Sequence, residues 1–252
     1  MQFGGVVALK GIDLRFEPGQ VVSIIGPNGS GKTTFFNVIS GIYRPTAGRV
    51  CLRVDGGERD ITGLPTHQIT TSGVARTFQT IRLFKEMSVL ENVLVGLHTH
   101  TDQGVLGALL HTRSFREEEA RVHHQARELL TFFPELPPLE GDVARSLSYA
   151  NQRRLEIVRA MATSPRVLLL DEPAAGMNPT EKVRLLHDIR RMKERVPLIL
   201  LIEHDMLMVR DISDRVIAFD HGELIADGVY DEVRQNPKVI EAYLGRGGDT
   251  HG

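Results

Sequence analysis

The chain has 252 residues, which is enough for one large α/β domain or for a core with a subdomain. Its 30 Lys and Arg residues nearly balance its 32 Asp and Glu residues, so no basic excess indicates nucleic-acid binding. The single cysteine, Cys51, excludes an intramolecular disulfide framework and fits a reducing compartment. No apolar run approaches the ~20 residues of a membrane span, and residues 1–10 lack the basic head and apolar core of a signal peptide. Any function at a membrane is therefore expected to act through a partner.

Two strands are predicted before residue 26. Ile12, Leu14 and Phe16 alternate with polar residues, which is typical of a strand exposed on one side. A Pro-Gly turn then leads to residues 21–25, an apolar run typical of a buried parallel strand.

A glycine-rich loop follows this strand and carries the strongest motif in the chain. Residues 26–34 read G-P-N-G-S-G-K-T-T, and residues 35–40 can continue as a helix. Glycines let successive backbone N–H groups point at phosphate oxygens, and a helix N-terminus adds partial positive charge at the same place. Lys32 is expected to reach the β- and γ-phosphates of a nucleotide, and the Thr33 hydroxyl to bind Mg²⁺. The residues predicted to bind phosphate are Gly26, Pro27, Asn28, Gly29, Ser30, Gly31, Lys32, Thr33 and Thr34.

The next stretch continues the α/β pattern and then becomes helical. The predicted elements are a strand at residues 48–54, a short helix at 63–73 and a short strand at 74–79, which ends at Gln79. From residue 83 to about residue 147 we find helical patterns and no convincing strand. Apolar residues recur there at helical spacing in residues 87–94 and 122–133.

Alternating helices and strands return after residue 147. The predicted elements are, in order, a helix capped by Ser148, a strand at residues 167–170, a helix at 180–195, a strand at 198–202, a hairpin of 216–219 with 224–226, and a helical tail at 231–245. This order predicts an α/β nucleotide-binding core that is interrupted by an all-helical insert.

Acidic and imidazole side chains follow two of the predicted strands. Asp171 and Glu172 come directly after an apolar run, and His204 follows the next strand along the chain. In hydrolysing P-loop enzymes such a carboxylate holds Mg²⁺, so we expect Asp171 to do so through water. Glu172 then lies where it can polarise the attacking water, and His204 can donate to a γ-phosphate oxygen. The alternatives are a loop that matches the phosphate motif by chance, a strand that merely ends in two acids, and a structural histidine.

The order of these motifs resembles that of ATP-binding cassette ATPases. The matching positions are residues 26–33, Gln79, residues 147–151, residues 168–172 and His204. The resemblance implies a P-loop NTPase core of mainly parallel sheet, with an antiparallel β subdomain and an inserted α-helical subdomain. It implies a core in residues 1–82 and 160–252, a helical subdomain in 83–159, and a C-terminal helix and tail in 231–252.

Several residue roles follow from this resemblance alone. Ser148, in the signature motif with Ala150, would bind the γ-phosphate held by the loop of a second subunit, in keeping with the anion site at a helix N-terminus. Gln79 would contact Mg²⁺ and the attacking water and couple the site to the helical insert, so that residues 80–87 face a permease. Phe3 lies where an aromatic ring stacks on adenine in these proteins, and simple packing at an edge is its alternative role. The implied cofactors are ATP and Mg²⁺.

Further segments are similar to the ATPases of branched-chain amino-acid importers. They are residues 76–79 with 82–84, 152–157, 172–179, 201–206 and 242–245. The resemblance implies a peripheral protein on the cytoplasmic face of a bacterial inner membrane. Two ATPase subunits, identical or different, would sit under two permease subunits fed by a periplasmic or lipid-anchored binding protein. Closure of the two cassettes on ATP would drive the permeases.

Other functions stay open at this point. Urea or amide importers and lipopolysaccharide exporters also resemble the chain, although the exporters usually lack an insertion like residues 104–114. A cassette ATPase that acts on DNA or ribosomes is the rival from another class, but the sequence carries no long coiled-coil insertion, second cassette or basic excess. A small-molecule kinase is a further rival, against which residues 147–151 and His204 argue.

Three residues depart from the usual cassette pattern. Ala150 replaces a glycine of the signature motif, Asn151 replaces a longer glutamine or acid, and Asn178 stands where most cassettes carry an aspartate. The Ala150 methyl group is harmless if the residue has a negative φ, and it is obstructive if the γ-phosphate must approach closely. If it obstructs the phosphate, Ala150→Gly should raise ATPase turnover, and this is the outcome that we expect. Relatives usually begin with several more residues that form an edge strand, so the chain either starts late or does without that strand.

Overall fold

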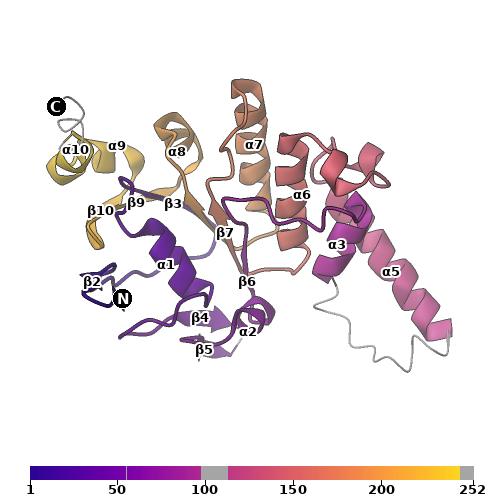
Figure 1. Cartoon of the computed structure of the whole chain (residues 1–252), viewed down its shortest axis with the longest axis horizontal. Helices are drawn as coiled ribbons and strands as arrows, with labels where there is room; N and C mark the ends of the chain where they lie inside the picture. The colour runs from indigo at the N-terminus through magenta and orange to yellow at the C-terminus, as the bar shows by residue number, and fades with distance from the viewer. Residues whose placement is uncertain (55, 98–112, 245–252) are drawn as a thin grey trace.

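A computed structural model describes residues 1–54, 56–97 and 113–244, the first four of the last range by their backbone only. At its centre is a six-stranded sheet with the strand order β10-β9-β3-β8-β7-β6 (Figure 1). The parallel strands are β3 (Gln20–Ile25), β6 (Val74–Arg76), β7 (Val167–Asp171), β8 (Leu198–Ile202) and β9 (Arg215–Asp220). β10 (Glu223–Gly228) pairs antiparallel with β9. The predicted mainly parallel sheet is confirmed.

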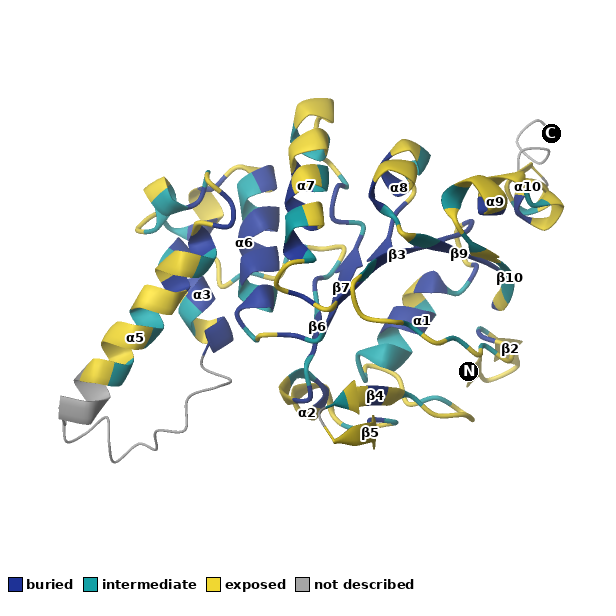
Figure 2. Cartoon of the chain, turned by 180° about the vertical axis from the view of Figure 1, so that it is seen from behind, coloured by how far each residue is buried: buried dark blue, intermediate teal, exposed yellow. Residues whose placement is uncertain are grey.

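Both faces of the sheet are covered, because successive side chains of a strand point to opposite sides. Leu168 and Leu170 join one core cluster and Leu169 joins the other. The first cluster lies under α3 (Val89–Leu97), α6 (Tyr149–Met161), α7 (Pro179–Met192) and α8 (Met206–Ile212), and the second lies against α1 (Lys32–Ile39). Figure 2 shows the central strands as a buried layer between these helices. Such cover on both faces explains why β7 and β8 are almost continuously apolar.

The helical insert lies to one side of the sheet, where α3 and α5 (Arg113–Leu130) pack beside α6 (Figures 1 and 2). Two short 3₁₀ helices follow, η2 (Pro137–Leu139) and η3 (Ala144–Ser146). Among the described residues from 83 to 147 there is no strand, only an isolated bridge between Ser88 and Val143. The predicted all-helical region is confirmed there, whereas most of the insertion at residues 104–114 lies outside the described residues.

Small elements surround the core. They are the antiparallel pairs β1 (Gln2–Phe3) with β2 (Val6–Val7) and β4 (Cys51–Val54) with β5 (Gly57–Asp60), and the helices α2 (Thr66–Thr71), α9 (Tyr230–Gln235) and α10 (Pro237–Leu244). In Figure 1, α9 and α10 lie at the β10 end of the sheet. None of the described helices combines the length and the apolar character needed to cross a bilayer.

The strand predicted from Ile12, Leu14 and Phe16 is wrong, since no strand lies between residues 7 and 20. These side chains are half-buried and pack against the core cluster that contains Phe35. Their alternation therefore reflects packing without strand pairing. β5 was not predicted, because its sequence Gly-Glu-Arg-Asp carries no apolar residue.

Candidate functional site

The predicted phosphate loop lies between the end of β3 and the start of α1. Gly26, Gly29 and Gly31 have φ angles of 144°, 79° and 107°, where a side chain would be strained. A Cβ atom at Gly26 would lie 2.2 Å from the carbonyl oxygen of Phe219, and one at Gly31 would lie 2.8 Å from that of Ala8. The loop therefore needs glycine at both ends to keep its place against the neighbouring backbone.

Lys32 is turned back into this loop. Its Nζ donates to the carbonyl oxygens of Gly26 at 2.7 Å and Pro27 at 2.9 Å, and the residue is only 5% exposed. Ser30 Oγ is buried and has no hydrogen-bond partner among the described residues. A buried cation beside an unpaired hydroxyl, at the N-terminus of a helix, is a suitable cradle for phosphate oxygens.

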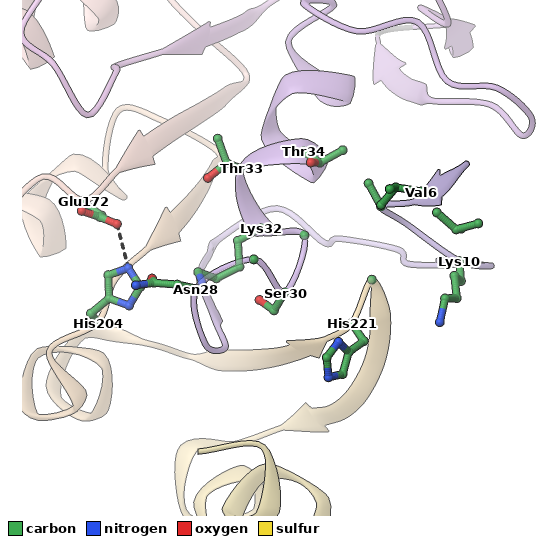
Figure 3. A pocket seen from close by; sticks show the side chains of 15 residues that line it. Val6, Lys10, Asn28, Ser30, Lys32, Thr33, Thr34, Glu172, His204 and His221 are labelled. Atoms are coloured by element: carbon green, nitrogen blue, oxygen red, sulfur yellow. Dashed lines mark hydrogen bonds and ion pairs between the residues drawn. The ribbon is translucent and has the colours of Figure 1, made fainter. Parts of the chain in front are cut away.

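A cavity of about 400 Å³ opens over the loop (Figure 3). Loop residues 28–34 line it from one side, and Glu172 and His204 reach it from the strand ends next to the loop. The remaining lining residues are Val6, Val7, Ala8, Lys10, His221 and Gly222. The loop and the two predicted catalytic side chains therefore share one cavity.

Glu172 is held by two other predicted site residues. Its Oε1 lies 2.7 Å from His204 Nε2, the contact drawn in Figure 3, and its Oε2 accepts from Gln79 Nε2 at 3.1 Å. The strands explain this meeting, because Asp171 pairs with Ile202 and the carboxyl ends of β7 and β8 lie side by side. Glu172 has a φ of 47°, a conformation that costs a non-glycine residue about 1–3 kcal/mol and is concentrated at functional sites.

Glu203 holds the two loops that carry these side chains. It is 5% exposed, and its carboxylate accepts from the backbone N–H groups of His204 at 2.8 Å, Asp205 at 3.3 Å and Ala174 at 3.4 Å. Burial raises the pKa of this carboxyl, and the three backbone donors oppose that rise. The sequence offered a signal that we did not use, an acid at the end of a wholly apolar strand.

Asp171 is buried and paired with Arg76, which the sequence analysis did not place in the site. Arg76 Nη2 donates to Asp171 Oδ2 at 2.8 Å. Arg76 Nη1 donates to Asn37 Oδ1 at 2.6 Å and Ser40 Oγ at 3.0 Å, both on α1. Arg76 thus ties the strand that carries Asp171 to the helix that follows the phosphate loop. A charged residue within a short buried strand was the signal that could have identified it.

The predicted Mg²⁺ ligands Thr33, Gln79 and Asp171 supply hydroxyl, amide and carboxylate oxygens, the ligand types that Mg²⁺ prefers. Thr33 lines the cavity, and Gln79 reaches the cavity residue Glu172 through its amide. The part of the chain that the structure describes contains no cluster of three or more His, Cys, Asp and Glu side chains suited to a metal ion. The donor set fits Mg²⁺ held jointly with phosphate oxygens rather than by the protein alone.

The signature residues lie apart from this cavity. Ser148 is the exposed N-cap of α6 and accepts from Asn151 N at 3.3 Å, but it does not line the cavity. Ala150 belongs to α6, is 2% exposed and packs in the first core cluster. Its methyl group packs in the core, which argues against obstruction of a nucleotide by this group, while a contact between Ala150 and nucleotide stays a prediction.

Phe3 and Asn178, which the sequence analysis singled out, both make contacts outside the cavity. The Phe3 ring packs edge-on against Tyr43, with centroids 5.0 Å apart, and does not line the cavity. Asn178 caps α7 in a capping box with Glu181, a role that needs a side-chain acceptor and that an apolar residue could not fill. Val6 and Val7, rather than Phe3, are the residues of the N-terminal hairpin that line the cavity.

Comparisons with known proteins agree along the chain. A family model described as "ABC transporter" matches residues 9–175, and one described as "Branched-chain amino acid ATP-binding cassette transporter" matches residues 223–249. BraF of Pseudomonas aeruginosa, named a high-affinity branched-chain amino acid transport ATP-binding protein, is 48% identical over 97% of this chain and 94% of its own. LivG of Escherichia coli, which carries the same description, is 45% identical over 97% of this chain and 94% of its own.

Solved structures give the same result. The ADP conformation of MJ1267, an ATP-binding cassette of an ABC transporter, has a TM-score of 0.81 at 34% identity and covers 97% of this chain and 95% of its own. A nucleotide-free ATP-binding cassette from an ABC transporter also has a TM-score of 0.81 at 34% identity, with 96% and 95% covered. These similarities confirm the predicted fold.

Proposed function

The chain belongs to the ABC transporter family as one of its ATP-binding, ATP-hydrolysing cassettes, and from this we propose that it drives an importer of branched-chain amino acids. The importer's substrate class is supported by the names of BraF and LivG and by the family model that matches the C-terminal segment. The single observation that carries the proposed site is the meeting of Gln79 and His204 on Glu172 beside the phosphate loop.

The proposed chemistry uses side chains that line or border the cavity. Lys32 and the loop amides bind the phosphates of ATP, and His204 holds the γ-phosphate. Glu172 accepts a proton from the attacking water while the water oxygen forms a bond to the γ-phosphorus. The bond between the γ-phosphorus and the β–γ bridging oxygen breaks at the same time, which gives ADP and phosphate. Thr33 and Gln79 would supply oxygen ligands for Mg²⁺, and Asp171 would hold it through water; the bound ion would neutralise phosphate charge.

A second cassette completes the site in this proposal. Ser148 is exposed at the start of α6 and lies outside its own chain's cavity, which supports a role against the γ-phosphate held by a partner cassette, identical or different. Closure on ATP would move the two helical regions together and so drive the permeases.

Phe3, which has an exposed ring, remains the proposed neighbour of adenine.

The proposed surface for a permease is a groove beside the helical insert. It has a volume of about 470 Å³, and its lining includes Arg82, Leu83, Phe84, Val95 and Arg159. Phe84 is 46% exposed, and the centroid of its ring lies 5.4 Å from Arg159 Cζ, so the groove offers an apolar ring beside a guanidinium group. We place the chain, peripherally, on the cytoplasmic face of a bacterial inner membrane, where a binding protein on the other side delivers the amino acid.

The test is the Glu172→Gln variant of the chain assembled with its permeases. Loss of the general base should lower ATPase turnover by about a hundred- to ten-thousand-fold while ATP stays bound. Bound ATP should then trap a closed cassette pair, which cross-linking or size-exclusion chromatography detects. Glu194→Gln, at an exposed position in the turn that follows α7, is the matched control and should behave as wild type. Wild-type turnover in Glu172→Gln would refute the assignment of the base.

A further inference from the structure

The first residue of the phosphate loop is held from two sides by side chains. Its carbonyl oxygen accepts from Lys32 Nζ at 2.7 Å, and its N–H donates to the hydroxyl of Tyr243 at 2.9 Å. Tyr243 lies 217 residues further along the chain, in the C-terminal helix α10. Gly26 is also packed tightly against β9, where no side chain could fit. Its position therefore depends on one contact within the loop and one from the far end of the chain.

α10 is anchored on the same part of the core as the loop. Val239 of α10 is buried in a cluster that contains Ile25, the residue before Gly26, together with Val216 and Ala218 of β9. Burial raises the pKa of the Tyr243 phenol, so its hydroxyl stays neutral near neutral pH and can accept from the Gly26 N–H. Val239 therefore anchors the helix that carries this hydroxyl, while the Tyr243 residue itself is 40% exposed.

The two contacts on Gly26 differ in what nucleotide binding does to them. A phosphate group bound in the loop accepts hydrogen bonds from Lys32 Nζ. The Gly26 carbonyl oxygen must then share this donor with the phosphate. The Tyr243 hydroxyl donates nothing to Gly26 and approaches from α10, so it keeps the N–H paired in both states. A loop that is fixed before binding loses less conformational freedom on binding, which strengthens affinity.

We propose that Tyr243 is a positioning residue for the phosphate loop, through which α10 sets the affinity of the cassette for nucleotide. This inference rests on the nucleotide site proposed above. By linkage, nucleotide binding must in turn stabilise α10, because two coupled sites change each other's free energy by the same amount. A residue that only stabilises the fold would not produce that reciprocal effect.

The experiment compares Tyr243→Phe with the full-length wild-type chain. The variant keeps the ring and removes the acceptor of the Gly26 N–H, so the dissociation constant for ADP, measured by calorimetric titration, should rise roughly two- to ten-fold. Tyr230→Phe, in the neighbouring helix α9, removes a hydroxyl that is not bonded to the loop and should leave this constant unchanged. Saturating ADP should slow hydrogen exchange in α10 of the wild type but not in α10 of Tyr243→Phe.

Three results would overturn the inference. They are an ADP dissociation constant in Tyr243→Phe equal to that of wild type, equal losses in Tyr243→Phe and Tyr230→Phe, and α10 exchange in the wild type that ADP does not change. Failure of the wild-type chain to bind ADP at all would instead overturn the proposed function, and this inference with it.

Discussion

Replacing Arg76 with methionine should destabilise the fold strongly, because it leaves the Asp171 carboxylate buried without its cation. The two side chains are 6% and 7% exposed, and Arg76 Nη2 lies 2.8 Å from Asp171 Oδ2. Removing one partner of such a buried pair costs about 3–5 kcal/mol, because the remaining charge is left uncompensated. Arg76→Met also removes the donors to Asn37 and Ser40, so we expect a loss near the upper end of that range.

Urea denaturation followed by circular dichroism measures this loss as a change in the free energy of unfolding. The double variant Arg76→Met with Asp171→Asn is the matched control, since it removes the buried carboxylate together with its cation. It should be more stable than Arg76→Met alone, and the difference from additivity reports the coupling of the pair. A cost below about 1 kcal/mol for Arg76→Met would place the pair among weak surface contacts and refute the reasoning.

Two further predictions follow from the buried groups. Burial, with the Glu135 carboxylate nearby, raises the pKa of Asp188 to about 6, although Arg154 and Arg191 oppose the shift. The folded chain thus holds this proton more tightly than the unfolded chain, so stability should fall as pH rises from about 4 through about 6, and urea unfolding of Asp188→Asn should show a flatter profile there. Ala150→Gly should cost about 1 kcal/mol of stability and leave ATPase turnover unraised, since the methyl group is in the core. Higher turnover in the assembled transporter would instead restore the idea that this methyl obstructs the γ-phosphate.

The sequence predicted those parts of the site that are encoded by short local patterns. The phosphate loop needs glycines at particular φ angles and a lysine at the helix start, and both requirements are visible in nine consecutive residues, 26–34. Glu172 and His204 were predictable as acids and imidazoles at the ends of apolar strands, because parallel strands bring their carboxyl ends to one edge. The motif order could therefore predict the cavity before its geometry was known.

The contacts that the sequence did not predict join residues far apart along the chain. Arg76 and Asp171 are 95 residues apart, and Tyr243 and Gly26 are 217 residues apart. A charge within a short buried strand marks Arg76 but does not name Asp171 as its partner, and no local pattern marks Tyr243, which is 40% exposed. The strand predicted at Ile12, Leu14 and Phe16 failed for the related reason that alternation records which side chains are buried and not which backbone they pair with.

The geometry around Glu172 connects hydrolysis to movement of the loop that carries Gln79. Both carboxylate oxygens of Glu172 are engaged, one by His204 and one by Gln79. Each carboxylate oxygen can accept a further hydrogen bond, so under the proposed mechanism the attacking water can bind beside either contact, and the two contacts set the position of the base. The Gln79 contact belongs to the segment that leads directly into residues 80–87, which we propose to face the permease. A shift of that segment would therefore change how the Glu172 carboxylate is held, which links the position of the base to residues 80–87.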